Sequence, residues 1–120
     1  MAVFIKHIFD PYDTEDGSRY LVCDIPNGYS AEQLMIAGCI KNLAPDNIYD
    51  NMNDDEWKNF RKIYYQKLLQ PENEPMIDFL AQKASQENLT ILFVESHRTR
   101  NHAMVLKTLL ELRIKAELED

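Results

Sequence analysis

The sequence predicts an α/β fold in which a small, mostly parallel β-sheet is flanked by about four helices. In the second half of the chain a helical pattern, an apolar strand pattern, a loop and another helical pattern follow one another, which favours a parallel sheet. The chain has 120 residues, of which 45% are hydrophobic and 28% charged, so it is long enough to bury one core. We therefore expect residues 1–120 to form a single compact domain.

Three apolar segments predict the strands. Residues 3–9 are rich in β-branched and aromatic side chains, and residues 20–23 form a short apolar run. Residues 90–94 continue an apolar run through the whole segment, which is typical of a strand buried on both faces of a sheet. Turn-forming Pro, Gly, Asn and Asp residues follow the first two segments, so we expect loops there.

Helical patterns occupy four further segments. The clearest begins after Asn53, because Glu56 follows three residues later in the arrangement of a capping box. Trp57, Phe60 and Tyr64 then fall on one helix face, as expected for core positions. We predict helices over these residues: 31–43, 54–70, 75–86, and from Thr99 or Asn101 to near the C-terminus.

The helix over residues 31–43 is predicted from its ends. Ser30 can cap it, because the serine hydroxyl can accept a hydrogen bond from a free N–H group of the first turn. Pro45 ends it, because the residue before a proline is disfavoured in helical conformation. Gly38 lies in its interior and weakens it.

The formal net charge of −7 limits the partners of the chain. Such a charge repels phosphate groups at long range, so we expect no broad binding to nucleic acid or to anionic membranes, although a small local basic patch is compatible with it. The N-terminus lacks a signal-peptide pattern, and no segment reaches the length of a membrane span. Cys23 and Cys39 lie beside apolar residues, which predicts two reduced, buried thiols in a cytoplasmic protein.

No pattern in the sequence predicts a metal or another cofactor. The two cysteines do not form a Cys-x-x-Cys pair, and no thiols accompany His97 and His102. The acidic residues 46–56 fail the EF-hand pattern, because Glu56 falls where a glycine is required. We interpret this acidic segment as a solvated helix start.

The best candidate site lies where two predicted strands end, because ligands of parallel sheets bind beyond the carboxyl ends of the strands. The loop over residues 95–101 is basic within an acidic chain and leads into a helix N-terminus, where N–H groups favour anions. The loop over residues 24–29 begins with a carboxylate. We therefore predict a site for a small anionic ligand formed by Asp24, Arg98, Arg100, Asn101 and His102.

A second interpretation needs no ligand at these residues. Arg98 and Arg100 can pair with surplus carboxylates of the chain, Asp24 among them, and such surface pairs stabilise little. The protein would then be a non-catalytic interaction or assembly module with a degenerate site. The aromatic residues that could cover its interface are Tyr12, Tyr29 and Tyr49. The sequence predicts no particular oligomeric state.

Catalysis is the weaker expectation. Ser96 and His97 are neighbours at a strand end, where successive side chains point to opposite faces, so the imidazole does not readily reach the hydroxyl. The Gly-x-Ser-x-Gly turn of serine hydrolases is absent from the sequence. Asp24 could act as a general base, but we lean toward a protein without enzyme activity.

Four motifs resemble a known family when they are taken in chain order. They are an Asp-Pro turn with an acidic stretch before Gly-x-Arg (residues 10–19), Lys-x-Leu-Ala-Pro (residues 41–45), Trp-x-x-Phe-x-x-x-Tyr (residues 57–64), and a Thr-Ile-Leu-Phe strand with a later Asn-x-Ala-x-x-Leu (residues 90–106). Together they resemble the family called domain of unknown function 488, also named YeaO-like, over nearly the whole chain. The resemblance implies the α/β fold and the place of a site, but no reaction.

The chain departs from this family at the segment that marks it most clearly. The family has Asp-Arg-Leu-Trp-Pro-Arg-Gly after the second strand, whereas residues 23–28 read Cys-Asp-Ile-Pro-Asn-Gly. Pro26 and Gly28 match, but both arginines and the tryptophan are replaced. Arg100 replaces the histidine before Asn101, which itself matches. The resemblance therefore implies a divergent member whose site is lost or altered.

Overall fold

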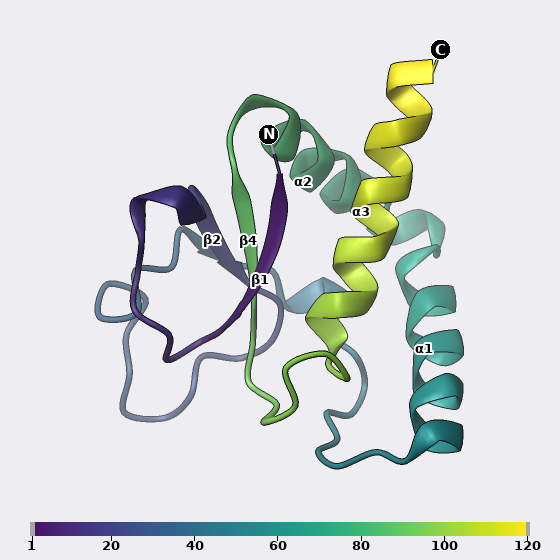
Figure 1. Cartoon of the computed structure of the whole chain (residues 1–120), viewed down its shortest axis with the longest axis horizontal. Coiled ribbons are helices and arrows are strands. Elements are labelled where there is room, and N and C mark those ends of the chain that lie inside the picture. Colours follow the sequence, from purple (N-terminus) through teal and green to yellow (C-terminus); the bar gives the residue numbers. More distant parts are fainter. Residues whose placement is uncertain (1, 120) are drawn as a thin grey trace.

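Four parallel strands form the centre of the structure, a computed structural model that describes residues 2–119 (Figure 1). The strands are β1 (Val3–His7), β2 (Ser18–Leu21), β3 (Gly38–Cys39) and β4 (Leu89–Phe93). Their spatial order is β1-β4-β2-β3, so the strand that comes last in the chain lies between the first two. Leu89 pairs with both Val3 and Ser18, so β1, β4 and β2 begin at the same level in the sheet. The expectation of a parallel sheet is confirmed.

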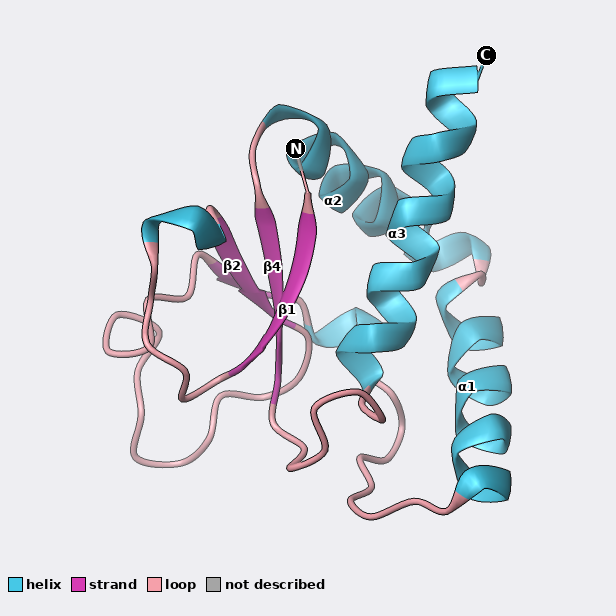
Figure 2. Ribbon diagram, in the orientation of Figure 1, coloured by secondary structure: helices cyan, strands magenta, loops and turns pink. Residues whose placement is uncertain are grey.

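The three α-helices of the described residues lie to one side of the sheet (Figure 2). They are α1 (Asp54–Leu68), α2 (Glu74–Gln86) and α3 (His102–Glu119). α2 and α3 pack on the strands, and α1 packs on α3. Their apolar faces bury the alternate strand residues that point toward them, among them Ile91 and Phe93, in one core with Leu80 and Leu106. The helices therefore cover one face of the sheet.

Segments that contain no α-helix cover the opposite face of the sheet. The crossovers that precede β2 and β3 pass over this side, with only the short 3-10 helix η1 (Thr14–Asp16) in the first of them. Leu21 and Leu92 are buried there, and Leu34 and Ile36 of the second crossover pack on this cluster. Two further 3-10 helices are η2 (Lys41–Leu43) and η3 (Pro71–Asn73).

The predicted helix over residues 31–43 is wrong, so residues 2–119 contain three α-helices rather than about four. Its cap does form, because the Ser30 hydroxyl accepts a hydrogen bond from Gln33 N at 3.2 Å. The chain then leaves the helical path at Met35, which has a positive φ of 55°. Gly38 pairs with Tyr20 of β2, and a Cβ atom at Gly38 would lie 2.8 Å from the Tyr20 ring. The glycine that weakens a helix is therefore needed for a close strand contact.

The other predicted helices are confirmed, with small shifts at their ends. The Asn53 side chain accepts a hydrogen bond from Glu56 N at 2.8 Å, and Asn53 N donates to the Glu56 carboxylate at 3.0 Å, which completes the capping box. Pro75 lies in the first turn of α2. On α1, Phe60 and Tyr64 are buried as predicted.

A tight turn and a buried ion network hold the start of β2. Gly17 has a φ of +63°, and a Cβ atom there would lie 1.9 Å from the carbonyl oxygen of Asn88. The carboxylate of Asp16 contacts Lys6 Nζ at 3.0 Å and Arg19 Nη1 at 3.3 Å. Arg19 is fully buried. The Gly-x-Arg motif that contributes to the family resemblance therefore has a structural role here.

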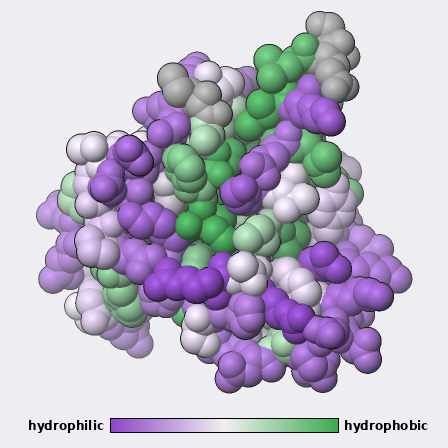
Figure 3. Space-filling model, in the orientation of Figure 1, coloured by the Kyte–Doolittle hydropathy of each residue, from purple (hydrophilic) through white to green (hydrophobic). Residues whose placement is uncertain are grey.

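The surface divides into an apolar and a polar region in the view of Figure 3. Hydrophobic side chains gather over β1 and the later turns of α3, where Leu112 and Leu118 are exposed. Polar side chains cover the lower rim, where the strand-end loops and the first turns of α1 lie. None of the helices in residues 2–119 is long and apolar enough to cross a membrane.

Candidate functional site

The carboxyl ends of β2 and β4 lie side by side, and the chain leaves them toward opposite faces of the sheet. After β2 it enters the helix-free crossover, and after β4 it leads into α3. This is the geometry at which open parallel sheets form a ligand crevice. A hollow of about 510 Å³ opens there, lined by Cys23 and Asp24 after β2, by Val94 after β4 and by Lys41 of η2.

The five predicted site residues do not converge on this hollow. Asp24 lines it, with a side chain that is 83% exposed, and its carboxylate pairs with Lys41 Nζ at 3.3 Å. The predicted pairing of Asp24 with Arg98 or Arg100 is therefore wrong. Both arginines pair instead with other carboxylates, Asp10 and Asp54, because the fold places these carboxylates closer to them than Asp24.

Arg98 lies on the surface and is held by Asp10, which follows β1. Its two terminal nitrogens donate to the two carboxylate oxygens of Asp10 at 2.6 and 3.2 Å, a bidentate arrangement. The hydrogen bond from Arg98 lowers the pKa of the Asp10 carboxyl, and the same contact raises the pKa of Arg98. The guanidinium also lies 5.9 Å from the centre of the Phe93 ring. Arg98 therefore ties the end of β1 to the loop after β4.

Arg100 extends in another direction, toward the start of α1. Its guanidinium donates to the backbone oxygen of Met52 at 2.9 Å and forms an ion pair with Asp54. Arg98 and Arg100 both pair with carboxylates of the chain, as the second interpretation predicted. They brace two different loops and do not form one anion clamp.

Asn101 and His102 are buried and begin α3. The side-chain oxygen of Asn101 accepts a hydrogen bond from Met104 N at 2.9 Å, and its amide nitrogen donates to the His97 backbone oxygen at 2.9 Å. Asn101 thus caps the helix and closes the preceding loop. Its match to the family motif is explained by this structural role.

Glu95 is the residue at the strand ends that the sequence interpretation missed. Its buried carboxylate accepts hydrogen bonds from the backbone N of His102 at 2.7 Å and from the ring Nδ1 of His102 at 2.9 Å. Since a carboxylate can only accept, Nδ1 carries the hydrogen and Nε2 is the free ring nitrogen. Among the described residues, His102 Nε2 has no hydrogen-bond partner. The one available signal was a carboxylate placed directly after a buried strand.

Burial and hydrogen bonding shift the pKa of Glu95 in opposite directions. Burial disfavours the charged carboxylate, but the hydrogen bonds from the His102 ring and backbone outweigh burial, and the pKa of Glu95 lies below its usual value. The rings of His102 and Tyr64 meet edge to face, with ring centres 6.2 Å apart. Tyr64 in turn donates its hydroxyl to the backbone oxygen of Leu43 at 2.6 Å. The pair is therefore enclosed by core side chains.

Neither the thiols nor the Ser-His pair is arranged for nucleophilic attack. Cys23 is buried, and burial raises the pKa of its thiol to about 12. Cys39 is partly buried, and desolvation raises the pKa of its thiol as well. The Ser96 hydroxyl donates to Asp50 at 3.2 Å, while His97 Nδ1 accepts a hydrogen bond from the Arg100 backbone N at 2.9 Å. In the part of the chain that the structure describes, no three His, Cys, Asp or Glu side chains are placed to hold a metal ion.

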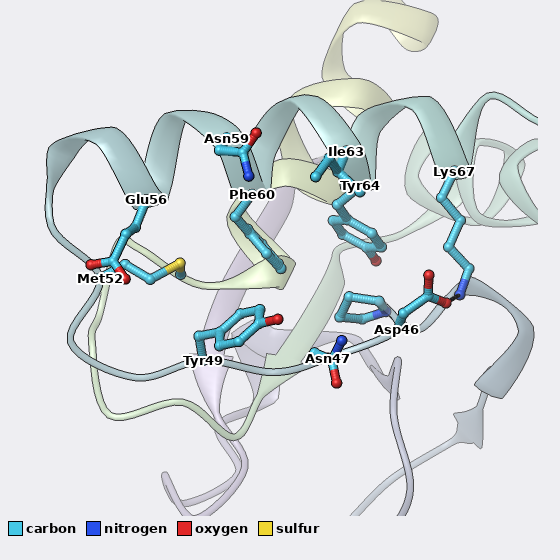
Figure 4. Close-up of a pocket in the computed structure, with 11 residues that line it drawn as sticks. Asp46, Asn47, Tyr49, Met52, Glu56, Asn59, Phe60, Ile63, Tyr64 and Lys67 are labelled. Carbon is cyan, nitrogen blue, oxygen red and sulfur yellow. Dashed lines mark hydrogen bonds and ion pairs between the residues drawn. The ribbon is translucent and has the colours of Figure 1, made fainter.

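A second hollow lies between the loop over residues 45–52 and α1, and we call it the loop–α1 groove (Figure 4). Its volume is about 370 Å³. Tyr49 of the loop and Phe60 of α1 meet edge to face, with ring centres 6.3 Å apart. Glu56 lies at one end of the groove, and the ion pair of Lys67 with Asp46 lies at the other. Between these ends Ile63 and Tyr64 add apolar surface, and Asn47 and Asn59 add polar groups.

Comparison of the sequence with known proteins shows that this α/β domain is a divergent member of the DUF488 class. The chain belongs to the family DUF488-N3i, described as the inactive DUF488-N3 subclade, whose family model matches residues 2–120. It is also similar to the "Uncharacterized protein YeaO" of Escherichia coli (strain K12), with 31% identity over 110 residues, which cover 88% of this chain and 94% of that protein. No solved structure matches the chain significantly.

Proposed function

We propose that this protein is a non-catalytic binding module that holds a segment of a partner protein in the loop–α1 groove. The observation that carries the proposal is a contrast between two regions. The ionisable groups predicted to act at the strand ends are engaged by other parts of the chain, whereas the loop–α1 groove is open and leaves apolar side chains exposed.

The absence of catalysis is supported by the use made of each acid–base group. Glu95 and His102 are buried against each other, and the Cys23 thiol is held in its neutral form by burial. A catalytic acid or base must reach the proton that it transfers in a bound substrate. The description of the family as an inactive subclade agrees with this proposal.

The binding role is supported by apolar side chains that the groove leaves exposed. Tyr49 on the loop is 50% exposed, and Ile63 on α1 is 55% exposed, although both line the same hollow. Burying an aliphatic or aromatic side chain contributes about 1.5–3 kcal/mol. An apolar anchor side chain of a partner would therefore be bound mainly by removal of this surface from water.

Charge indicates which partner segment fits. Residues 46–56, which form one wall of the groove and lead into the other, contain five acidic residues and no Lys, Arg or His. Lys67 is the basic residue of the groove lining, and Asp46 neutralises it. Lysine or arginine residues beside an apolar anchor would be attracted to this rim, and glutamate would be repelled. We propose a basic segment with an apolar anchor, in a cytoplasmic setting that the two free thiols support.

Fluorescence anisotropy with short labelled peptides tests the proposal. Three peptides are compared: one with a central Phe flanked by lysines, one with a central Ala in the same flanks, and one with a central Phe flanked by glutamates. We expect the first to bind at least about tenfold more tightly than each of the others, since about 1.4 kcal/mol corresponds to tenfold. Equal affinities, or no binding at millimolar peptide, would contradict the proposal.

A matched pair of variants locates the binding. Ile63→Asp places a charge in the groove, whereas Leu112→Asp changes a side chain of 54% exposure on α3, which is outside the groove lining. Both variants alter net charge equally and lie on helix surfaces. Only Ile63→Asp should weaken the lysine-flanked Phe peptide, by about tenfold or more. An equal loss in both variants would show that the peptide binds through general charge.

A further inference from the structure

A different groove lies between α1 and the N-terminal half of α3. Its lining is positively charged, whereas the chain as a whole is negatively charged. We call it the α1–α3 groove. Its volume is about 670 Å³, within the range of about 300–1,000 Å³ that small-molecule sites occupy. Its cationic and aromatic lining residues are Lys58, Arg61, Lys62, Arg100, Trp57 and Tyr65. The lining contains no Asp or Glu among residues 2–119.

The cations of this groove stand out because most other cations of the chain are neutralised. Lys41, Lys67 and Arg98, for example, each form an ion pair with a carboxylate. By contrast, Lys58, Arg61 and Lys62 form no ion pair with any carboxylate that the structure describes. All three are exposed and line one groove. In a chain of net charge −7, unpaired cations gathered in one place make a local positive field.

Helical spacing places these side chains together. Lys58, Arg61, Lys62 and Tyr65 follow one another at intervals of three, one and three residues along α1, so they share one face. The Arg61 guanidinium lies 5.5 Å from the centre of the Trp57 ring, a cation–π contact that positions its planar group. Arg100 contributes from the loop that precedes α3, where Asp54 and the Met52 backbone hold it.

The aromatic lining narrows the kind of anion. Tyr65 and Trp57 are partly buried, and Met104 and Val105 provide an apolar wall on α3. A bare inorganic anion would use the cations and leave these surfaces without a contact. A nucleoside phosphate carries both a phosphate group for the lysines and a planar base for the aromatic and guanidinium surfaces. The overall negative charge disfavours a long polyanion, because its outer phosphates would extend beyond the basic groove.

We propose that the α1–α3 groove is a binding site for a nucleoside phosphate. In this site Lys58 and Lys62 contact the phosphate groups, and Tyr65 together with the Arg61–Trp57 pair contacts the base. The site is separate from the loop–α1 groove, with which it shares no lining residue, so each proposal can fail without the other.

The chain provides its own reporter for this test. Trp57 is the only tryptophan in the sequence and lines the groove, so binding should change the tryptophan fluorescence. Titrations would use purine and pyrimidine nucleoside mono-, di- and triphosphates, with inorganic pyrophosphate and a short single-stranded oligonucleotide as separate arms. We expect at least one nucleoside phosphate to bind at least about tenfold more tightly than pyrophosphate. An oligonucleotide should bind no more tightly, per site, than the free nucleotide.

Charge reversal locates the site. Lys62→Glu changes a groove cation, and Lys115→Glu changes an exposed cation of α3 that does not line the groove, with the same change in net charge. Lys62→Glu should weaken nucleotide binding by about tenfold or more, and Lys115→Glu should not. Arg61→Ala should weaken the nucleotide more than pyrophosphate. Melting temperatures would confirm that each variant is folded, and Lys58→Glu provides a second groove variant if Lys62→Glu is not.

Four outcomes would overturn the proposal. They are no fluorescence change with any nucleotide at millimolar concentration, equal affinity for pyrophosphate and nucleotides, equal losses in Lys62→Glu and Lys115→Glu, and binding confined to the oligonucleotide. The second would leave a site for simple anions, and the last would indicate a nucleic-acid strand as the partner.

Discussion

Glu95 holds His102 at two points, since its carboxylate accepts a hydrogen bond from the backbone N of His102 and another from the ring Nδ1. The two residues stand at the end of β4 and the start of α3, so the pair fixes the short loop between them. Both side chains are fully buried. Removing one partner of a buried pair leaves the other unsatisfied, and this sets the size of the first prediction.

Glu95→Gln should destabilise the protein by about 3 kcal/mol, because a neutral amide offers a single acceptor oxygen in place of the carboxylate. The free energy of unfolding from urea denaturation at neutral pH would measure the loss. Glu111→Gln, at an exposed ion pair on α3, is the control and should change stability by less than about 1 kcal/mol. A loss below that limit in Glu95→Gln would mean that the pair does not hold the loop.

Acid should destabilise the wild-type protein through Glu95, Asp10 and Asp16. In the folded state the pKa of each of these carboxyls lies below its usual value. Their contribution to stability is therefore present above the unfolded pKa values, about 3.9–4.3, and is lost as pH falls through the lower folded values. Unfolding free energies measured from neutral pH downward should fall below about pH 5. The slope should be shallower in Glu95→Gln, and an identical slope would count against a lowered pKa of Glu95.

Two glycines with positive φ should differ in their tolerance of alanine. A Cβ atom at Gly17 would lie 1.9 Å from the Asn88 carbonyl oxygen, whereas Gly28 has no atom within 4 Å of the corresponding position. Gly28→Ala should cost only the left-handed backbone strain of about 1–2 kcal/mol. Gly17→Ala must also move the chain near Asn88 and should cost at least about 2 kcal/mol more. Melting curves of the two variants would measure this difference, and equal costs would contradict the contact at Gly17.

The two thiols should react at different rates in the native protein. Burial raises the pKa of the Cys23 thiol to about 12 and restricts its access, while Cys39 is partly exposed. With an aromatic disulfide reagent at mildly alkaline pH, Cys39 should react slowly and Cys23 should not react until denaturant is added. Cys39→Ser isolates Cys23. Fast modification of this variant without denaturant would contradict the burial of Cys23.

β1, β2, β4 and the three α-helices could be predicted because their signals are local. The capping box at Asn53 and the apolar run of residues 90–94 both led to the correct element. The segment over residues 31–43 could not, because its local signals favour a helix while β3 depends on the Tyr20 ring and the β2 backbone. A contact with a neighbouring strand leaves no periodic pattern in such a short segment.

The candidate site was harder to predict because it depends on partners distant in sequence. Asp10, the partner of Arg98, is 88 residues away, and Asp54, the partner of Arg100, is 46 residues away. We expected Asp24 to lie close to the arginines because they follow neighbouring strand ends. In the structure Lys41 pairs with Asp24 instead. The α1–α3 groove was missed for the same reason, since Lys58 and Lys62 resemble an ordinary solvated helix face until the fold places Arg100 beside them.

The position of β4 in the middle of the sheet also constrains how the chain can fold during its synthesis. β1 and β2 share no strand pairing and are joined only through β4, whose last residue is Phe93. While the ribosome is still producing α1 and α2, the first two strands have exposed edges and no partner between them. The edges of β1 and β2 that pair with β4 must therefore stay unpaired until residues 89–93 have emerged, a period during which these edges are open to association with other chains.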